Sequence, residues 1–245
     1  MAERKEQIHR LRDGSEILIK RSGNHQYTFG DSTRKFTSTT GLAKHIDADS
    51  GGLIQWAVDE SFARNDRLGH RASASESAEK GTKLHEAVER FIIKNDASEI
   101  DEVFALWLKQ VGNHHKWASA EVMVINPETG SGGTCDALSF GSGNQVIAWD
   151  WKTKRREQSY LNSIPIFKDH AQIANYVRAF ANMSSEYNVD QQTAKIAYLC
   201  LDTKKVYVED VDITNAYELF KQSASLYRSK NAYKKGVSID SKDSP

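Results

Sequence analysis

The sequence predicts an α/β fold in which a central mixed sheet is flanked by helices. Changes in the spacing of apolar residues support this fold. Apolar residues recur at helical spacing between residues 53 and 112, and the spacing then changes to a period of two between 117 and 152. Helical spacing returns at 169–182 and at 213–227, on either side of an expected strand pair at 194–211. We expect one domain over residues 1–232 and a disordered polar tail over 233–245.

The composition is that of an ordinary globular protein with no net charge. Lysine plus arginine number 33, as do aspartate plus glutamate, so a nucleic-acid partner would need a local basic patch. The two cysteines exclude a disulfide framework and a four-cysteine iron–sulfur or zinc site. Neither a secretory signal nor a membrane-spanning stretch is visible. We therefore expect a soluble intracellular protein with no membrane partner.

The first forty residues predict short strands followed by a segment rich in hydroxyl groups. Strands are expected at 8–12, 16–20 and 26–29, with Asp13-Gly14 as the hairpin turn between the first two. Ser38, Thr39 and Thr40 then follow Phe36-Thr37. Hydroxyl groups at this point can cap the start of a helix, or they can contact a phosphate group. The sequence leaves both roles open.

Three helices are expected between residues 53 and 112. The first covers 53–64, and a polar stretch at 66–76 that carries Arg67, His70 and Arg71 predicts a loop. The second helix is expected from Ser77, with His85 at the rim of its apolar arc, which consists of Leu84, Ala87, Val88, Phe91 and Ile92. The third helix is expected at 99–112. His114-His115 is interpreted as part of a loop, because adjacent side chains diverge and do not share a metal.

The second half of the chain predicts the strands that carry acidic residues. Strands are expected at 117–125 with Glu121, at 134–140 with Asp136, and at 145–152 with Asp150 and Lys152 near its end. The turn-rich connector at 126–133 is not followed by the Gly-Lys-Ser/Thr of a phosphate-binding loop. After a loop at 157–168, the helix at 169–182 aligns Gln172 and Tyr176 on one face.

Asp136, Asp150 and Lys152 form the first candidate site. Side chains two apart on a strand point the same way, so Asp150 and Lys152 leave the apolar run together. If the turn between the last two strands centres on Gly143, Asp136 lies opposite Asp150, at a Cβ separation of about 5 Å. Two carboxylates at so short a distance repel each other, and they favour a hard divalent cation such as Mg²⁺ between them. This chemistry suits metal-dependent phosphodiester hydrolysis, although a surface ion pair remains the alternative.

Four short motifs occur in an order that resembles a known family. They are Gly81-Thr82-Lys83-Leu84-His85, Gly133-Thr134-Cys135-Asp136, Asp150-Trp151-Lys152-Thr153-Lys154 and Gln172-Ile173-Ala174-Asn175-Tyr176. Together they resemble the RecB-like branch of the PD-(D/E)xK nuclease superfamily. The segments 36–40 and 52–56 are similar to the entry motif of the mitochondrial genome maintenance exonuclease group and its phage relatives. The chain departs from the pattern because no proline precedes Asp136 and because Asp150 stands where many members have glutamate.

The resemblance implies a role for each motif residue. It implies His85, Asp136, Asp150 and the carbonyl of Trp151 as metal ligands, Lys152 as the catalytic lysine and Glu121 as a support acting through water. It implies DNA contacts by Gln172 and Tyr176, and by Ser38 with Thr39 or Thr40. We expect further contacts from the basic run with Lys154 and Arg155, which begins at the site, and from Arg67 and Arg71. The expected cofactor is Mg²⁺ or Mn²⁺, with no iron–sulfur cluster.

The resemblance favours a restriction-endonuclease-like core and an exonuclease acting on ends of single-stranded DNA. Its expected setting is DNA replication, recombination or repair in the cytoplasm of a bacterial or phage-infected cell, with proteins of those processes as further partners. A structure- or sequence-specific endonuclease of the same fold is an alternative. A DNA-binding module that has lost activity is another, although the complete Asp136, Asp150 and Lys152 set argues against it.

Overall fold

The computed structural model describes residues 5–10, 15–46, 51–98, 101–142, 145–154, 167–183 and 188–235. Within these ranges the largest sheet has the strand order β4-β6-β7-β8-β9, and β5 pairs with the remaining edge of β6. The strands are β4 (Thr37–Ser38), β5 (Trp117–Asn126), β6 (Ser131–Phe140), β7 (Gln145–Lys154), β8 (Asn188–Cys200) and β9 (Lys205–Asp210). Strand pairs β4–β6 and β7–β8 are parallel, whereas β5–β6, β6–β7 and β8–β9 are antiparallel. The predicted mixed α/β fold is confirmed.

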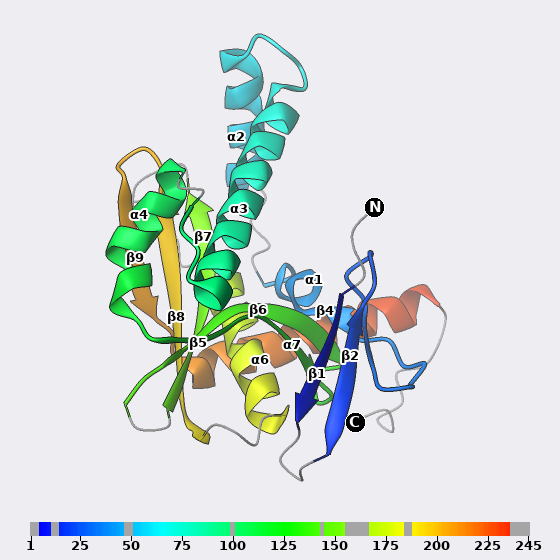
Figure 1. Cartoon of the computed structure of the whole chain (residues 1–245). Coiled ribbons are helices and arrows are strands. Elements are labelled where there is room, and N and C mark those ends of the chain that lie inside the picture. The colour runs from blue at the N-terminus through cyan, green and yellow to red at the C-terminus, as the bar shows by residue number, and fades with distance from the viewer. Residues whose placement is uncertain are drawn as a thin grey trace.

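Helices cover both faces of this sheet (Figure 1). Helices α6 (Phe167–Met183) and α7 (Ile213–Lys234) share one apolar cluster with Val146 and Ala148 of β7. Helices α3 (Gly69–Lys94) and α4 (Glu102–Gln110) share a second cluster with Trp149 and Trp151. Alternate residues of β7 thus face different helices, as the period of a strand requires. No helix in the described part of the chain has the length and apolar character needed to cross a membrane.

A small antiparallel sheet at the N-terminus packs beside β5. It contains β1 (Lys5–Arg10), β2 (Glu16–Arg21) and β3 (Tyr27–Phe29). The side chain of Gln7 accepts a hydrogen bond from the backbone of Met123 at 2.6 Å. The expected pairing of the first two strands is confirmed, whereas their Asp13-Gly14 turn lies outside the described residues.

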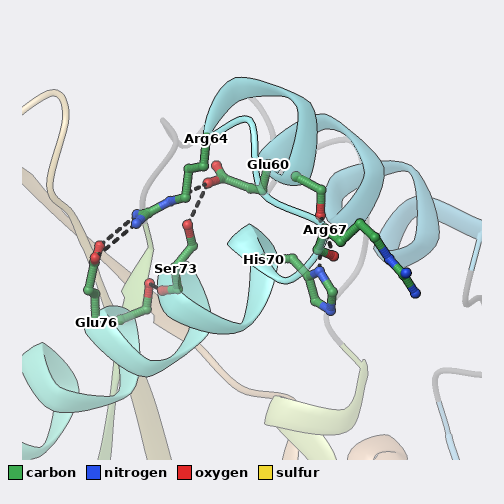
Figure 2. A network of polar contacts seen from close by, with 8 residues as sticks. Glu60, Arg64, Arg67, His70, Ser73 and Glu76 are labelled. Carbon is green, nitrogen blue, oxygen red and sulfur yellow. Dashed lines mark hydrogen bonds and ion pairs between the residues drawn. The ribbon is translucent and has the colours of Figure 1, made fainter.

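The expected loop at 66–76 is wrong, because α3 already begins at Gly69. The first turns of α3 and the preceding α2 (Gly51–Ala63) form a helical hairpin that projects from the body of the molecule, and we call it the arm (Figure 1). Polar contacts join its helices: Ser73 donates to Glu60 at 2.5 Å, and Arg64 pairs with Glu76 at 2.8 Å (Figure 2). The apolar pattern missed this part of α3 because few apolar side chains hold it.

Two further boundaries differ from the sequence prediction. Strand β6 begins at Ser131 rather than Thr134. Its first residues include Gly132 and Gly133, and neither position has room for a side chain. A Cβ atom on Gly132 would collide with Tyr27, and one on Gly133 would collide with the ring of Tyr176. Helix α7 continues to Lys234, so it includes the start of the tail that was expected to be disordered. Residues 236–245 lie outside the described part of the chain.

Candidate active site

The register between β6 and β7 brings the two motif aspartates together. Ala137 pairs with Trp149 and Phe140 with Val146, and the same register continued by one residue aligns Asp136 with Asp150. Positions 143 and 144 of the expected turn lie outside the described residues. Both side chains are buried, with 9% of Asp136 and 1% of Asp150 exposed. Lys152 leaves β7 on the same face as Asp150, and its Nζ lies 2.6 Å from Asp150 Oδ2. The expected juxtaposition of these three residues is therefore observed.

His85 reaches this site from the opposite layer of the molecule. Helix α3 is anchored over the sheet by Leu84, Ala87 and Val88, all of them buried in the second apolar cluster. This anchoring brings His85 Nδ1 to 3.4 Å from Asp136 Oδ1. The other oxygen of Asp136 accepts a hydrogen bond from the backbone N–H of Trp151 at 2.8 Å. Asp136 is thus oriented by contacts on both of its oxygens.

Glu121 completes a group that could hold a cation. His85, Glu121 and Asp136 each offer a ligand atom, and these atoms lie within 4.8 Å of one another. One imidazole nitrogen and two carboxylate oxygens form a donor set that suits a divalent metal ion. Asp150 lies beside this group, where Lys152 holds it. The donor set therefore fits the expected Mg²⁺ or Mn²⁺, with Glu121 nearer to its centre than the resemblance implied.

The charges of the site shift one another's proton affinities. Burial alone would lower the pKa of His85, but the negative charges of Asp136, Asp150 and Glu121 outweigh it and raise that pKa to about 9. Burial raises the pKa of Asp150 to about 7, against the opposing effect of the Lys152 ammonium. Burial and the neighbouring Asp136 also raise the pKa of Glu121. A site in which carboxylates repel one another gains from an added positive charge.

Asp169 is a charged residue of this region that the sequence reasoning missed. It lies in the first turn of α6, it is 4% exposed, and its Oδ2 is 3.7 Å from the Nζ of Lys154. The negative charges of Asp150 and Asp169 raise the pKa of Lys152 despite its burial. Asp169 precedes Gln172 by three residues and therefore shares its helix face. That spacing is the signal that could have identified it.

The predicted partners on α6 lie together. Gln172 Nε2 donates to the hydroxyl of Tyr176 at 3.1 Å, and both side chains are buried. The ring of Tyr176 lies directly against the backbone of Gly133, three residues before Asp136. The close approach of α6 to β6 thus links the Gln172 motif to the aspartate motif.

The hydroxyl segment has divided roles. Ser38 Oγ accepts from the backbone N–H of Gly41 at 3.0 Å and caps α1 (Thr39–Ala43), so the capping interpretation is confirmed for Ser38. Thr39 is fully buried, where its hydroxyl donates to the carbonyl of Gly132 and accepts from Asn175. The side chain of Thr39 therefore has a structural role, and the DNA contact expected of Thr39 or Thr40 stays a prediction. Thr40 is exposed.

The basic residues expected to contact DNA also differ from one another. Lys154 turns inward, with its ammonium 5.3 Å from the centre of the Tyr198 ring and close to Asp169. Arg155 lies outside the described residues. Arg67 and Arg71 are exposed on the arm.

The fold and the site thus define a mixed α/β protein with a centre of two buried aspartates, a half-buried histidine and a half-buried lysine. No family model matches the sequence, and no curated protein matches it. Among solved structures, the protein SSO0001 is 16% identical with a TM-score of 0.42, over 77% of this chain and 75% of that chain. An alkaline exonuclease from Laribacter hongkongensis, LHK-Exo, is 10% identical with a TM-score of 0.44, over 82% of this chain and 92% of that chain. Its complex with dAMP gives 11% identity, a TM-score of 0.41 and the same coverage. Likeness at this level does not assign an activity to this chain.

Proposed function

We propose that this protein is a divalent-metal-dependent deoxyribonuclease that hydrolyses phosphodiester bonds at the ends of single-stranded DNA. The observation that carries the proposal is the convergence of His85, Asp136, Asp150 and Lys152 from three elements on one buried centre. A surface ion pair would not be buried and would not recruit a histidine from another layer. The preference for single-stranded ends rests on the motif resemblance and is part of the proposal.

Each side chain of the centre has a defined task in this reaction. His85, Asp136 and Asp150 would hold Mg²⁺ or Mn²⁺, joined by the carbonyl of Trp151. A bound divalent cation supplies Lewis-acid chemistry, which activates water and neutralises charge on the phosphate. Lys152 remains protonated and stabilises the negative charge that develops on the phosphate oxygens. The amide of Gln172 and the hydroxyl of Tyr176 would orient the strand near the scissile bond.

The decisive test of the proposed function combines one substitution with removal of the metal. Asp150→Asn removes one carboxylate while keeping the shape of the side chain, and we expect cleavage of end-labelled single-stranded DNA to fall by about a thousandfold. Chelation of divalent ions should abolish cleavage by the unmodified protein. DNA binding, measured by fluorescence anisotropy with Ca²⁺, should survive in the variant.

Asp31→Asn, a substitution at an exposed position outside the residues of the centre, is the matched control and should cleave normally. The variants should first be compared by circular dichroism, because Asp150→Asn leaves the buried Lys152 without its partner. Unchanged cleavage by a folded Asp150→Asn variant, or cleavage that persists in chelator, would contradict the proposal.

A further inference from the structure

Glu121 adopts a backbone conformation that its position in a strand does not explain. Its φ angle is +51°, in the left-handed region, although it lies in the middle of β5. Side chains other than glycine, asparagine and aspartate rarely adopt this conformation. Its neighbours Ala120 and Val122 pair with Ala137 and Cys135 in one continuous register, so no extra residue is inserted at this point. The register shift of β5 lies earlier, between Trp117 and Ser119, so the left-handed backbone of Glu121 is a separate local feature.

The register places Glu121 opposite Asp136, because the pairs Ala120–Ala137 and Val122–Cys135 lie on either side of it. The carboxylate of Glu121 belongs to the group with His85 and Asp136, whose ligand atoms lie within 4.8 Å of one another. The residue with the left-handed backbone is therefore the one that brings a carboxylate to this group. Glycine could adopt the same conformation without strain, so the backbone geometry alone does not require glutamate.

The carboxylate of Glu121 is partly buried and lies in one group with the carboxylate of Asp136 and the imidazole of His85. Such a set of oxygen and nitrogen donors suits a divalent cation. Residues in strained backbone conformations are concentrated at functional sites. Asp150, by contrast, already has the ammonium of Lys152 at 2.6 Å.

We propose that Glu121 is a direct ligand of the divalent ion and that its left-handed backbone is what aims the carboxylate at His85 and Asp136. The inference rests on the proposed function and deepens it, because the motif resemblance implied only an indirect role through water. In this inference His85, Glu121 and Asp136 bind the ion first. In the metal-free protein, Asp150 is paired with Lys152. Glutamate at position 121 should therefore favour metal binding, whereas glycine at the same position should favour folding stability.

The test uses Glu121→Gly, which preserves the left-handed backbone and removes the carboxylate. In chelator we expect the melting temperature to rise by about 3 °C, because strain and repulsion are both relieved. The affinity for Mn²⁺ alone, measured by isothermal titration calorimetry, should fall at least about tenfold. The rise in melting temperature on addition of Mn²⁺ should disappear. Glu121→Gln should lose Mn²⁺ affinity equally, with a smaller gain in stability because its backbone strain remains.

His25→Gly is the matched control for the backbone. His25 has a φ angle of +53° in the exposed turn between β2 and β3, far along the chain from the metal ligands. This variant should gain stability in the same way and bind Mn²⁺ like the unmodified protein. A Glu121→Gly variant that binds Mn²⁺ with unchanged affinity would overturn the ligand role. A variant less stable than the unmodified protein in chelator would overturn the inferred strain.

These results separate the inference from the proposed function. An unmodified protein that binds Mn²⁺ through Glu121 but leaves DNA intact would contradict the nuclease activity and support the ligand role. An unmodified protein that cleaves DNA, together with a Glu121→Gly variant of normal Mn²⁺ affinity, would contradict only the ligand role.

Discussion

His85 shows at the scale of a single residue how the centre depends on its surroundings. Its imidazole must be neutral to bind a metal ion, yet the surrounding carboxylates raise its pKa to about 9 in the metal-free protein. A proton on His85 and a divalent ion therefore compete for the same negative surroundings. Asp150, with a pKa raised to about 7, changes its charge over a lower part of the same range. The stability of the metal-free protein should therefore change with pH as His85 and Asp150 gain or lose their protons.

We predict that the metal-free protein loses stability as the pH rises and that Mg²⁺ restores it. The pKa of His85 is higher in the folded protein than its ordinary 6.5, so its stabilising contribution is complete below 6.5 and is lost as the pH rises through about 9. The raised pKa of Asp150 removes further stability between its ordinary 3.8 and about 7, because ionisation is disfavoured in the folded state. The difference in melting temperature with and without Mg²⁺ should accordingly grow across this range.

His85→Asn provides the control for this pH dependence. Without the imidazole, the part of the dependence that lies above pH 7 should disappear, whereas the part due to Asp150 should remain. A stabilisation by Mg²⁺ that is equal at all pH values would contradict the prediction.

The arm is the element that the pattern of apolar residues predicted least well, because polar contacts join its two helices. Its network ties Arg64 to Glu60 and Glu76, and Ser61 to His70 (Figure 2). Figure 2 shows the side chain of Arg67 pointing away from this network. No ion pair of Arg67 or Arg71 occurs within the described ranges, and both are exposed. From Gly69, helix α3 rises about 24 Å to His85, so a strand lying along the arm would lead towards the candidate centre.

We predict that the double substitution Arg67→Ala, Arg71→Ala weakens binding of single-stranded DNA and leaves the rate at saturating DNA unchanged. Each lost phosphate contact should reduce the slope of log affinity against log salt by about 0.7. A titration of labelled DNA at several salt concentrations measures this slope.

Arg64→Ala is the matched control on the same element. It removes a charge that is engaged by Glu76 at 2.8 Å. This substitution should lower the thermal stability of the protein and leave the salt dependence of DNA binding nearly unchanged. Equal salt slopes for the double variant and the unmodified protein would exclude the arm from DNA contact.

For the whole molecule, the sequence predicted the features that follow from the alternation of apolar and polar residues and from the positions of turns. The switch from helical to strand spacing gave the mixed sheet, and the glycine turn at 143 gave the register that aligns Asp136 with Asp150. It could not predict the left-handed Glu121, because no residue pattern marks a strained glutamate. It missed the early start of α3, because polar contacts such as that of Ser73 with Glu60 hold this part and leave no apolar pattern. It also missed Asp169, for which the spacing to Gln172 was the available signal.

The architecture of the whole molecule leads to a prediction about its substrate. Asp136, Asp150, Gln172 and Tyr176 are nearly buried. Glu121 is partly exposed, as are the side chains of His85 and Lys152, at 33% and 23%. Such a recessed centre is easier to reach for a thin, flexible single strand than for a duplex. We therefore predict that linear single-stranded DNA is degraded in Mg²⁺ and that a circle of the same sequence stays intact.

The comparison of linear and circular DNA also separates the two modes of cleavage. An enzyme that needs an end leaves the circle untouched for as long as the linear form is being consumed. An endonuclease first converts the circle to a full-length linear molecule, which a denaturing gel resolves from shorter products. Because both forms present the same phosphates and bases, a difference in their rates reports only the need for an end. If circular DNA disappears as fast as linear DNA, the protein is an endonuclease and not an exonuclease. The proposed roles of the residues in the centre would be unaffected by that result.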